Sequence, residues 1–240
     1  MDLKPKTLIA VVVWDLPLRI FHWLLVVGVL GAYITAKLGG SLIDWHGYFG
    51  VLVLGLLIFR LIWGVVGTVY AQFASFLPTP ARLQAYLDGR WHGEGHNPLG
   101  ALAVFAILGA VLLVAGSGLF ANDDIAFQGT WVNLIDKAVS DTISAWHSLT
   151  FDVLTVLIVL HLAAIGFYRW HKQQNLVLPM LTGKKLLAES DTNVCSNRYL
   201  SRFLFALVLA LALTWVIYRG IPDYFSTTQS NTLPAATSSW

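Results

Sequence analysis

The chain has 240 residues and a formal net charge of +2; 57% of its residues are hydrophobic and only 12% are charged. Soluble domains carry about 25% charged residues, so this composition excludes an ordinary soluble protein. The single cysteine excludes an intramolecular disulfide and a cysteine-rich metal site, which leaves metal ligation to seven histidines and the carboxylates. We expect an integral membrane protein surrounded by the lipid bilayer, with no nucleic-acid partner.

Five apolar segments are each long enough to cross a hydrocarbon core of ~30 Å, which needs about 20 helical residues. They lie near 18–37, 46–69, 98–120, 147–168 and 201–219. The first could be mistaken for a secretion signal, but it is long, carries Arg19 and His22 near its start and lacks a small-x-small cleavage site. We therefore expect it to remain in the mature protein.

Loop charges predict the orientation of these spans. If the N-terminus is cytoplasmic, that side holds most of the lysines and arginines, as the positive-inside rule requires. The opposite side is acidic on balance, with Lys37, Lys137 and Arg219 against Asp44, Asp123, Asp124, Asp136, Asp141 and Asp223. We expect a cytoplasmic N-terminus and a C-terminus on the opposite side.

The first two predicted spans each begin with a histidine. His22 opens the first span on the cytoplasmic side, and His46 opens the second on the outer side. Arg60 follows His46 by fourteen residues, so it lies on the same helix face about four turns deeper. The first three spans also contain glycines, which either make room for a flat cofactor or allow close helix packing: Gly28, Gly31, Gly50, Gly109, Gly116 and Gly118.

The fourth span contains two histidines fourteen residues apart, His147 and His161. Fourteen residues make nearly four helical turns, so both imidazoles lie on one helix face about 21 Å apart. One ring is expected near each membrane surface. His147 then matches His46 in depth on the outer side, and His161 matches His22 on the cytoplasmic side.

These matched depths predict two histidine pairs. Imidazole is a common axial ligand of haem iron, and the core of a helix bundle is where such a cofactor is held. A single histidine near the end of a span is more often an interfacial residue, but four that match in depth favour ligation. We therefore predict two haems, each with two axial histidines, stacked across the bilayer.

Basic side chains near the predicted haems are candidates for binding the propionates, whose charge needs partners at low dielectric. Arg60 and Arg19 are the candidates for the inner haem, the alternative being that they extend to the lipid interface. His92 and His96 have a spacing suitable for a metal pair, but the flanking glycines and proline favour solvated loop residues.

Four stretches of the sequence carry a resemblance to a known family. They are VVVWDLPLRIFHW, WHGYFGVLVLGLLIFRLIWGVVG, NPLGALAVFAILGAVLLVAGSGLF and WHSLTFDVLTVLIVLHLAA. Over about residues 10–185 the chain resembles the bacterial cytochrome b561 family and its nickel–iron hydrogenase b-type relatives. The ligand positions of the family match His22, His46, His147 and His161, and its arginine after the second-span histidine matches Arg60.

The resemblance implies a four-helix core that binds two b haems and exchanges electrons between the quinone pool and a partner redox protein. We therefore expect a bacterial inner-membrane protein that uses quinone as substrate. The direction of electron flow stays open, and so does the question of whether the protein is an enzyme in its own right. Asp152 is a candidate proton relay for quinone, the alternative being a carboxylate that reaches interfacial water.

The outer partner is partly predicted by charge. Some members of the family oxidise superoxide, which makes a superoxide:quinone oxidoreductase one alternative. An acidic entrance repels that anion, and the outer loop 121–146 carries four aspartates against Lys137. We therefore favour a periplasmic c-type cytochrome or a redox-enzyme subunit.

The C-terminal part departs from the resemblance. We divide the chain into a cytochrome b561-like domain, 1–185, and a region 186–240 with an extra span near 201–219 and a polar tail, STTQSNTLPAATSSW. The extra helix either lies against the bundle or binds a partner subunit. The fold class is thus all-α: a four-helix transmembrane bundle plus one helix. A haem-free membrane anchor or transporter is the alternative of another class, although neither inverted repeats nor paired helix interruptions are found.

Overall fold

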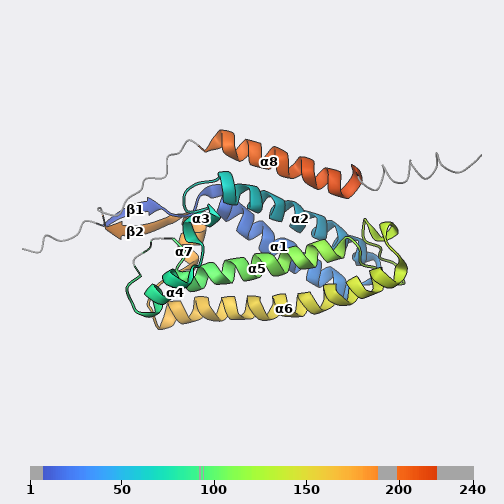
Figure 1. Ribbon diagram of the computed structural model, residues 1–240, viewed down its shortest axis with the longest axis horizontal. Helices are drawn as coiled ribbons and strands as arrows, with labels where there is room; N and C mark the ends of the chain where they lie inside the picture. Colours follow the sequence, from blue (N-terminus) through green and yellow to red (C-terminus); the bar gives the residue numbers. More distant parts are fainter. Residues whose placement is uncertain (1–7, 92, 94, 189–198, 221–240) are drawn as a thin grey trace, which may run out of the picture.

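The computed structural model describes residues 8–91, 93, 95–188 and 199–220 (Figure 1). Five helices are long and apolar enough to cross a membrane, which makes the chain a multi-pass membrane protein. They are α1 (Leu16–Leu38), α2 (Ile43–Val66), α5 (Pro98–Gly118), α6 (Lys137–Trp170) and α8 (Leu200–Trp215), the last continued by a π-helical turn, Val216–Gly220. Residue 92, residues 189–198 with Cys195, and the polar tail lie outside the described residues.

Each predicted span is confirmed by one of these helices, but the fourth is longer than predicted. Helix α6 begins at Lys137, ten residues before His147, and has 34 residues. The additional turns contain Ser140 and Asp141, whose side chains accept hydrogen bonds from Asn122 in the preceding loop, the one predicted to lie on the outer side. Hydropathy predicts only the apolar part of a helix, whereas these polar turns are stabilised by tertiary hydrogen bonds.

Local sequence determines where two of the helices begin. The carboxylate of Asp15 accepts a hydrogen bond from the backbone N–H of Leu18 at 2.7 Å, and Pro17 lies in the first turn of α1. Asn97 caps α5 in the same way through the N–H of Gly100 at 2.7 Å, directly before Pro98. Both pairs combine a side-chain acceptor for a free N–H group with a proline whose ring is preorganised for a helix start.

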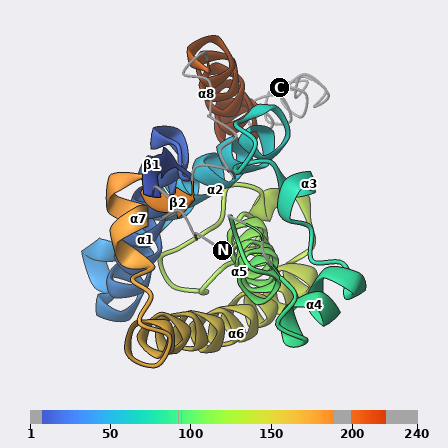
Figure 2. The ribbon, with the colours of Figure 1, turned by 90° about the vertical axis from the view of Figure 1, so that its left-hand side faces the viewer.

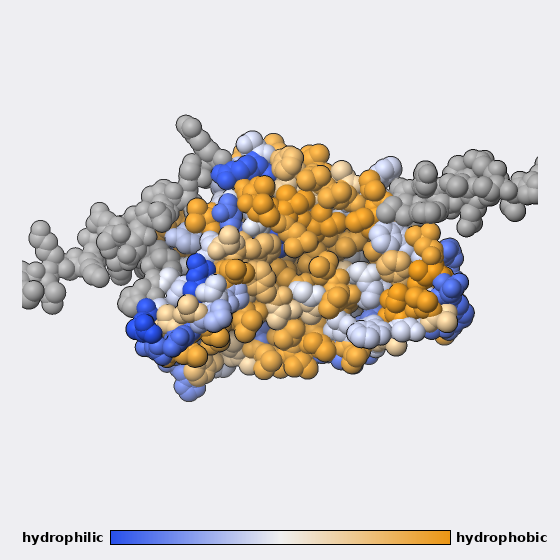
Figure 3. Space-filling model, viewed as in Figure 1, coloured by the Kyte–Doolittle hydropathy of each residue, from blue (hydrophilic) through white to orange (hydrophobic). Residues whose placement is uncertain are grey.

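Helices α1, α2, α5 and α6 form a bundle, and α8 lies outside it against α2 (Figure 2). On the face that Figure 3 shows, apolar residues cover the middle of the molecule and hydrophilic residues gather toward both ends. Many of the large apolar side chains on α6 and α8 are exposed, among them Val156, Leu160 and Leu211. This distribution is the one expected for helices in contact with lipid.

Three short helices lie at the end of the bundle where α1 begins: α3 (Phe73–Phe76), α4 (Pro80–Leu87) and α7 (Val177–Thr182). The same end holds a two-stranded sheet that the sequence pattern did not predict. Strand β1 (Leu8–Val12) pairs antiparallel with β2 (Lys184–Ala188), which crosses the predicted domain boundary. Five-residue strands so far apart in sequence give little local signal.

Gly183 makes this sheet possible. It adopts a φ of +81°, and its carbonyl accepts hydrogen bonds from the N–H groups of Val13 and Trp14. A Cβ at this position would lie 2.7 Å from the carbonyl oxygen of Trp14. Only glycine fits both the backbone conformation and the close approach.

Candidate functional site

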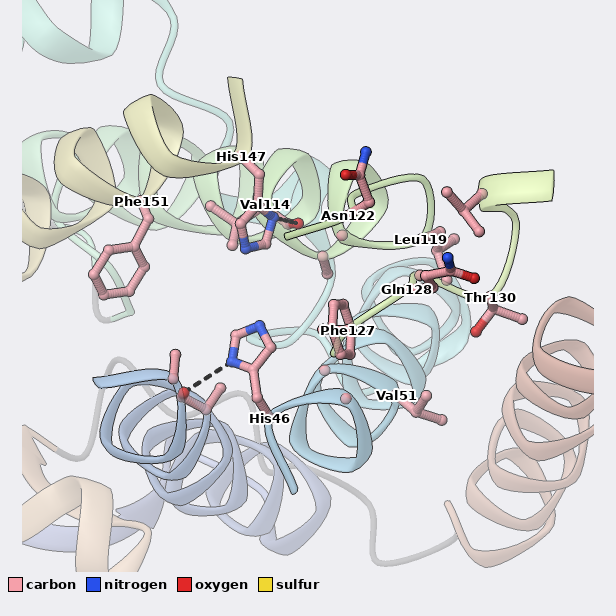
Figure 4. A pocket seen from close by; sticks show the side chains of 18 of the residues that line it. His46, Val51, Val114, Leu119, Asn122, Phe127, Gln128, Thr130, His147 and Phe151 are labelled. Carbon is pink, nitrogen blue, oxygen red and sulfur yellow. Dashed lines mark hydrogen bonds between the residues drawn. The ribbon is translucent and has the colours of Figure 1, made fainter. Parts of the chain in front are cut away.

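A cavity of about 1070 Å³ lies in the half of the bundle where α2 begins and α5 ends. His46 from α2 and His147 from α6 line it from opposite walls, and their imidazoles point toward one another (Figure 4). The ring centroids are 6.1 Å apart and the ring planes are at 82°. The structure therefore brings together the pair of histidines predicted for the outer side.

Both outer histidines are held in one tautomer by backbone carbonyls. The Nδ1 atom of His46 lies 2.9 Å from the carbonyl oxygen of Ala32, and that of His147 lies 2.9 Å from the carbonyl oxygen of Val114. A carbonyl oxygen only accepts hydrogen bonds, so each Nδ1 donates and each Nε2 keeps its lone pair. Metal-ligating histidines are usually oriented by a hydrogen bond of this kind.

The cavity fits a haem in volume and in ligand chemistry, and His46 and His147 are the residues that would hold it. Gly50 lines it, and a Cβ at that position would meet no atom within 4 Å, so the missing side chain leaves space. A Cβ at Gly118 would lie 3.2 Å from Cε1 of His147, so glycine lets this ring approach α5. Among the described residues, no group of three His, Cys, Asp or Glu side chains could hold a metal ion by itself. A histidine pair suits a metal whose other ligands come from a macrocycle.

Because Gly50 opens into the cavity, Gly50→Leu is expected to lower the haem content while the helices stay intact. The leucine side chain would occupy space that a macrocycle needs, and its Cβ would meet no protein atom within 4 Å. Pyridine haemochrome assay and circular dichroism of the purified variant measure the two quantities. Gly109→Leu is the matched control, because Gly109 lines an apolar groove on the α5–α6 surface instead. Equal haem loss in both variants would contradict the assignment of Gly50.

The inner histidines, His22 and His161, are less constrained. They lie close enough to influence one another electrostatically, and the indole of Trp23 packs edge-on to His22 with ring centroids 5.1 Å apart. The Nδ1 atom of His22 is buried without a hydrogen-bond partner in the described part of the chain. A buried polar atom without a partner indicates a missing interaction, for which a cofactor or a water molecule is the usual explanation.

The side chains of the two candidate arginines, Arg19 and Arg60, both point toward the protein interior and donate to backbone carbonyl oxygens. Arg60 is only 2% exposed; its Nη1 donates to the carbonyl oxygen of Ala71 at 3.1 Å, and its guanidinium lies 4.3 Å from the ring centroid of Phe73. Arg19 donates to the carbonyl oxygen of Leu181, and its Nε is buried without a partner among the described residues. Neither arginine lines the outer cavity. A role in holding a cofactor would therefore concern the haem predicted between His22 and His161.

Asp15 belongs to the same region and was not singled out by the sequence. It is 3% exposed and accepts hydrogen bonds from the indole N–H of Trp63 at 3.1 Å and the hydroxyl of Thr68 at 2.6 Å, besides the backbone of Leu18. It also interacts electrostatically with Arg60. The pattern Asp-Leu-Pro indicates a helix cap, but the partners of the second carboxylate oxygen come from α2 and the residues that follow it.

The prediction that His96 is a solvated loop residue is wrong. Its ring lies against Trp14 and Phe76, with centroids 4.4 and 4.5 Å apart, and burial, with a smaller effect of the Arg60 charge, lowers its pKa to about 4. The aromatic partners come from the segment between β1 and α1 and from α3, so no local pattern predicted them.

His92 lies outside the described residues. Asp152 is exposed on α6.

The low pKa of His96 makes folding sensitive to acid. In the unfolded chain His96 is protonated below its ordinary pKa of 6.5. In the folded chain it stays neutral until the pH falls to about 4. Stability is therefore expected to fall by on the order of 3 kcal/mol as the pH is lowered between these values. Thermal unfolding from pH 7 to 4 measures this, and His96→Phe should flatten the part of the profile due to this residue. An unchanged slope in the variant would contradict the prediction.

The outer loop closes one side of the cavity. The carboxylate of Asp123 accepts hydrogen bonds from the backbone N–H groups of Phe127, Ile125 and Ala126, and these bonds, chiefly that of Phe127, lower its pKa. The ring of Phe127 lies 5.7 Å from that of His46 and within 3.1 Å of a Cβ placed on Gly47. The acidic loop is thus folded over the cavity, and the side chains of Asp123 and Asp124 are exposed on it.

Comparison with known proteins agrees with this architecture. A family model described as prokaryotic cytochrome b561 matches residues 13–183. The chain is 28% identical to a protein named "Probable Ni/Fe-hydrogenase B-type cytochrome subunit" from Azotobacter chroococcum mcd 1, over 78% of this chain and 92% of that protein. The protein of the same name from Azotobacter vinelandii is 27% identical over the same shares.

No solved structure gives a significant match. The family match covers most of the chain and includes the three spans that carry the four predicted ligands. The chain belongs to the prokaryotic cytochrome b561 family and is a b-type membrane cytochrome, a protein of electron transfer.

Proposed function

We propose that this cytochrome holds two haem b groups, one between His46 and His147 and the other between His22 and His161. The observation that carries the proposal is the outer cavity, where two imidazoles with carbonyl-bonded Nδ1 atoms face each other. The inner pair is supported by two observations. His161 follows His147 on α6 by fourteen residues, and the Nδ1 atom of His22 is buried without a hydrogen-bond partner among the described residues. Two sites about 21 Å apart along one helix would carry electrons across the bilayer.

A bound haem would supply a one-electron iron couple, and the protein would tune it through ligation, burial and nearby charge. Ala32 and Val114 hold the outer imidazoles in the tautomer that leaves Nε2 free. At the inner site, Arg19 and Arg60 would balance the negative charge of the propionates. Asp15 is positioned to limit the net positive charge that Arg60 brings into the protein.

The outer redox partner is proposed to be a protein with a basic docking face. A redox-enzyme subunit is favoured because the relatives are named as hydrogenase cytochrome subunits, and a periplasmic c-type cytochrome is the alternative. The described outer loop supports a basic partner, since Lys137 binds both Asp124 at 2.8 Å and Asp141 at 2.9 Å and leaves the loop acidic on balance. Superoxide, an anion, is disfavoured at such an entrance. Quinone is the proposed partner on the membrane side.

This partner chemistry predicts that electron exchange with a basic c-type cytochrome slows with salt, on the order of tenfold from low to physiological ionic strength. Stopped-flow reduction in nanodiscs with quinol as donor measures the rate. Ferricyanide serves as an anionic control acceptor, for which screening should raise the rate. Salt-independent transfer to the cytochrome would contradict an electrostatic docking face.

The membrane placement is proposed from charge. The bacterial inner membrane with a cytoplasmic N-terminus would put Lys184 and Lys185 of β2 on the inside and the acidic loop in the periplasm, as the positive-inside rule expects. The division into a cytochrome domain, 1–185, and a separate region, 186–240, is likewise a proposal. Protease protection in oriented vesicles, with cleavage sites placed in the outer loop, tests the orientation.

A further inference from the structure

The fifth spanning helix reaches the outer cavity. Helix α8 is followed by the π-helical turn Val216–Gly220, and Tyr218 in this turn lines the same cavity as His46 and His147. This contribution comes from a segment for which the sequence predicts no ligand or cofactor contact. Tyr218 is half-buried, and the Arg219 guanidinium lies 5.5 Å from its ring centroid. π-Helical turns occur often at functional sites because they redirect a side chain locally.

Close packing on α2 holds α8 in place. Ala206 and Ala210 are buried, at 0% and 3% exposure, and a Cβ on Gly55 of α2 would lie 3.1 Å from Oγ1 of Thr214. Small residues on both helices therefore allow the backbones to approach closely. At the other end, Phe203 packs edge-on to Trp63 with ring centroids 6.2 Å apart. Helix α8 is fixed to the bundle along its length.

A hydrogen bond fastens the end of α8 to the outer loop. The indole N–H of Trp131 donates to the carbonyl oxygen of Ile217 at 2.8 Å, directly before Tyr218. Trp131 is itself anchored, because its backbone N–H donates to the carbonyl oxygen of Leu119 at 2.7 Å and its ring packs edge-on to Phe120. The position of Tyr218 at the cavity thus depends on both α2 and the loop.

We infer that Tyr218, as part of the wall of the outer cavity, excludes water, so that α8 sets how much water reaches the site between His46 and His147. The inference rests on the proposed outer haem. Water near a haem stabilises its more positively charged oxidised form, and solvent exposure is one of the factors that set haem potentials. An aromatic wall at this position raises the potential by excluding that water.

The test is a redox titration of the full-length protein in nanodiscs, with the outer haem assigned as the one lost in His147→Ala. In Tyr218→Ala, the ratio of reduced to oxidised outer haem at a fixed potential is expected to fall by on the order of threefold to tenfold. The ratio for the inner haem should not change. Oxidation of the pre-reduced outer haem by ferricyanide should become faster. Tyr218→Phe keeps the ring and should behave as the unaltered protein. Trp215→Ala is the matched control, because Trp215 is 64% exposed on the same helix.

Trp131→Phe provides a second variant that keeps Tyr218 but removes its anchor, and it should shift the potential in the same direction. An outer-haem potential unchanged in both Tyr218→Ala and Trp131→Phe would overturn the inference. An equal shift of both haems, or the same shift in Trp215→Ala, would overturn it as well, since each indicates a general structural effect. If the unaltered protein binds no haem at the outer pair, the haem count shows this beforehand and the proposed function itself fails.

Discussion

Replacing His147 with alanine is expected to remove one haem and leave the other. The pyridine haemochrome count should fall from about two to about one per chain, because an iron that loses one of its two axial imidazoles is no longer held. Electron transfer from quinol to an outer acceptor should fall by at least about tenfold to a hundredfold, since changing a group that only orients a metal-ligating histidine already costs that much. The fold should survive, because the ring faces a cavity and not a packed core.

Trp146→Ala is the matched control for this variant. Trp146 is the preceding residue on α6 and is 63% exposed, so its loss removes a larger ring without touching the cavity lining. Its haem count and turnover should match those of the unaltered protein. If His147→Ala retains both haems with an unchanged absorbance spectrum, the assignment of the outer ligands is wrong.

Replacing Asp15 with alanine is expected to destabilise the protein by on the order of 3 kcal/mol. The variant loses the cap of α1 and leaves the indole N–H of Trp63 and the hydroxyl of Thr68 without their acceptor in a buried position. It also removes the buried negative charge that interacts with Arg60. Thermal unfolding in detergent, followed by circular dichroism, measures the loss.

Asp136→Ala is the control for this second prediction. Asp136 occupies the same capping position at the start of α6, but its side chain makes no capping hydrogen bond. Its replacement should change stability little. Asp15→Asn should be intermediate, because an amide oxygen can still accept a hydrogen bond while the charge is lost. Equal stability of Asp15→Ala and Asp136→Ala would show that the buried contacts of Asp15 contribute nothing measurable.

The chain by itself determined the membrane class, the five spans and the positions of the four histidines along those spans. Hydropathy is a local property, and the helical repeat converts sequence spacing directly into depth along a helix. For that reason the positions of His46 and His147 in their spans, with the alternating direction of the spans, were enough to predict that the two would face each other, and the structure brings them together. The same arithmetic placed Arg60 deep on α2, where it is buried.

Only the tertiary structure decided what surrounds those residues. The carbonyl partners of the outer histidines, the two side-chain donors to Asp15, the aromatic rings against His96 and the place of Tyr218 in the cavity lining all join segments distant in sequence. Side-chain burial and hydrogen-bond pairing depend on which helices pack together and at what separation, and neither quantity is encoded in local periodicity. The strand β2 and the first turns of α6 escaped prediction for the same reason, because their stability comes from partners elsewhere in the chain.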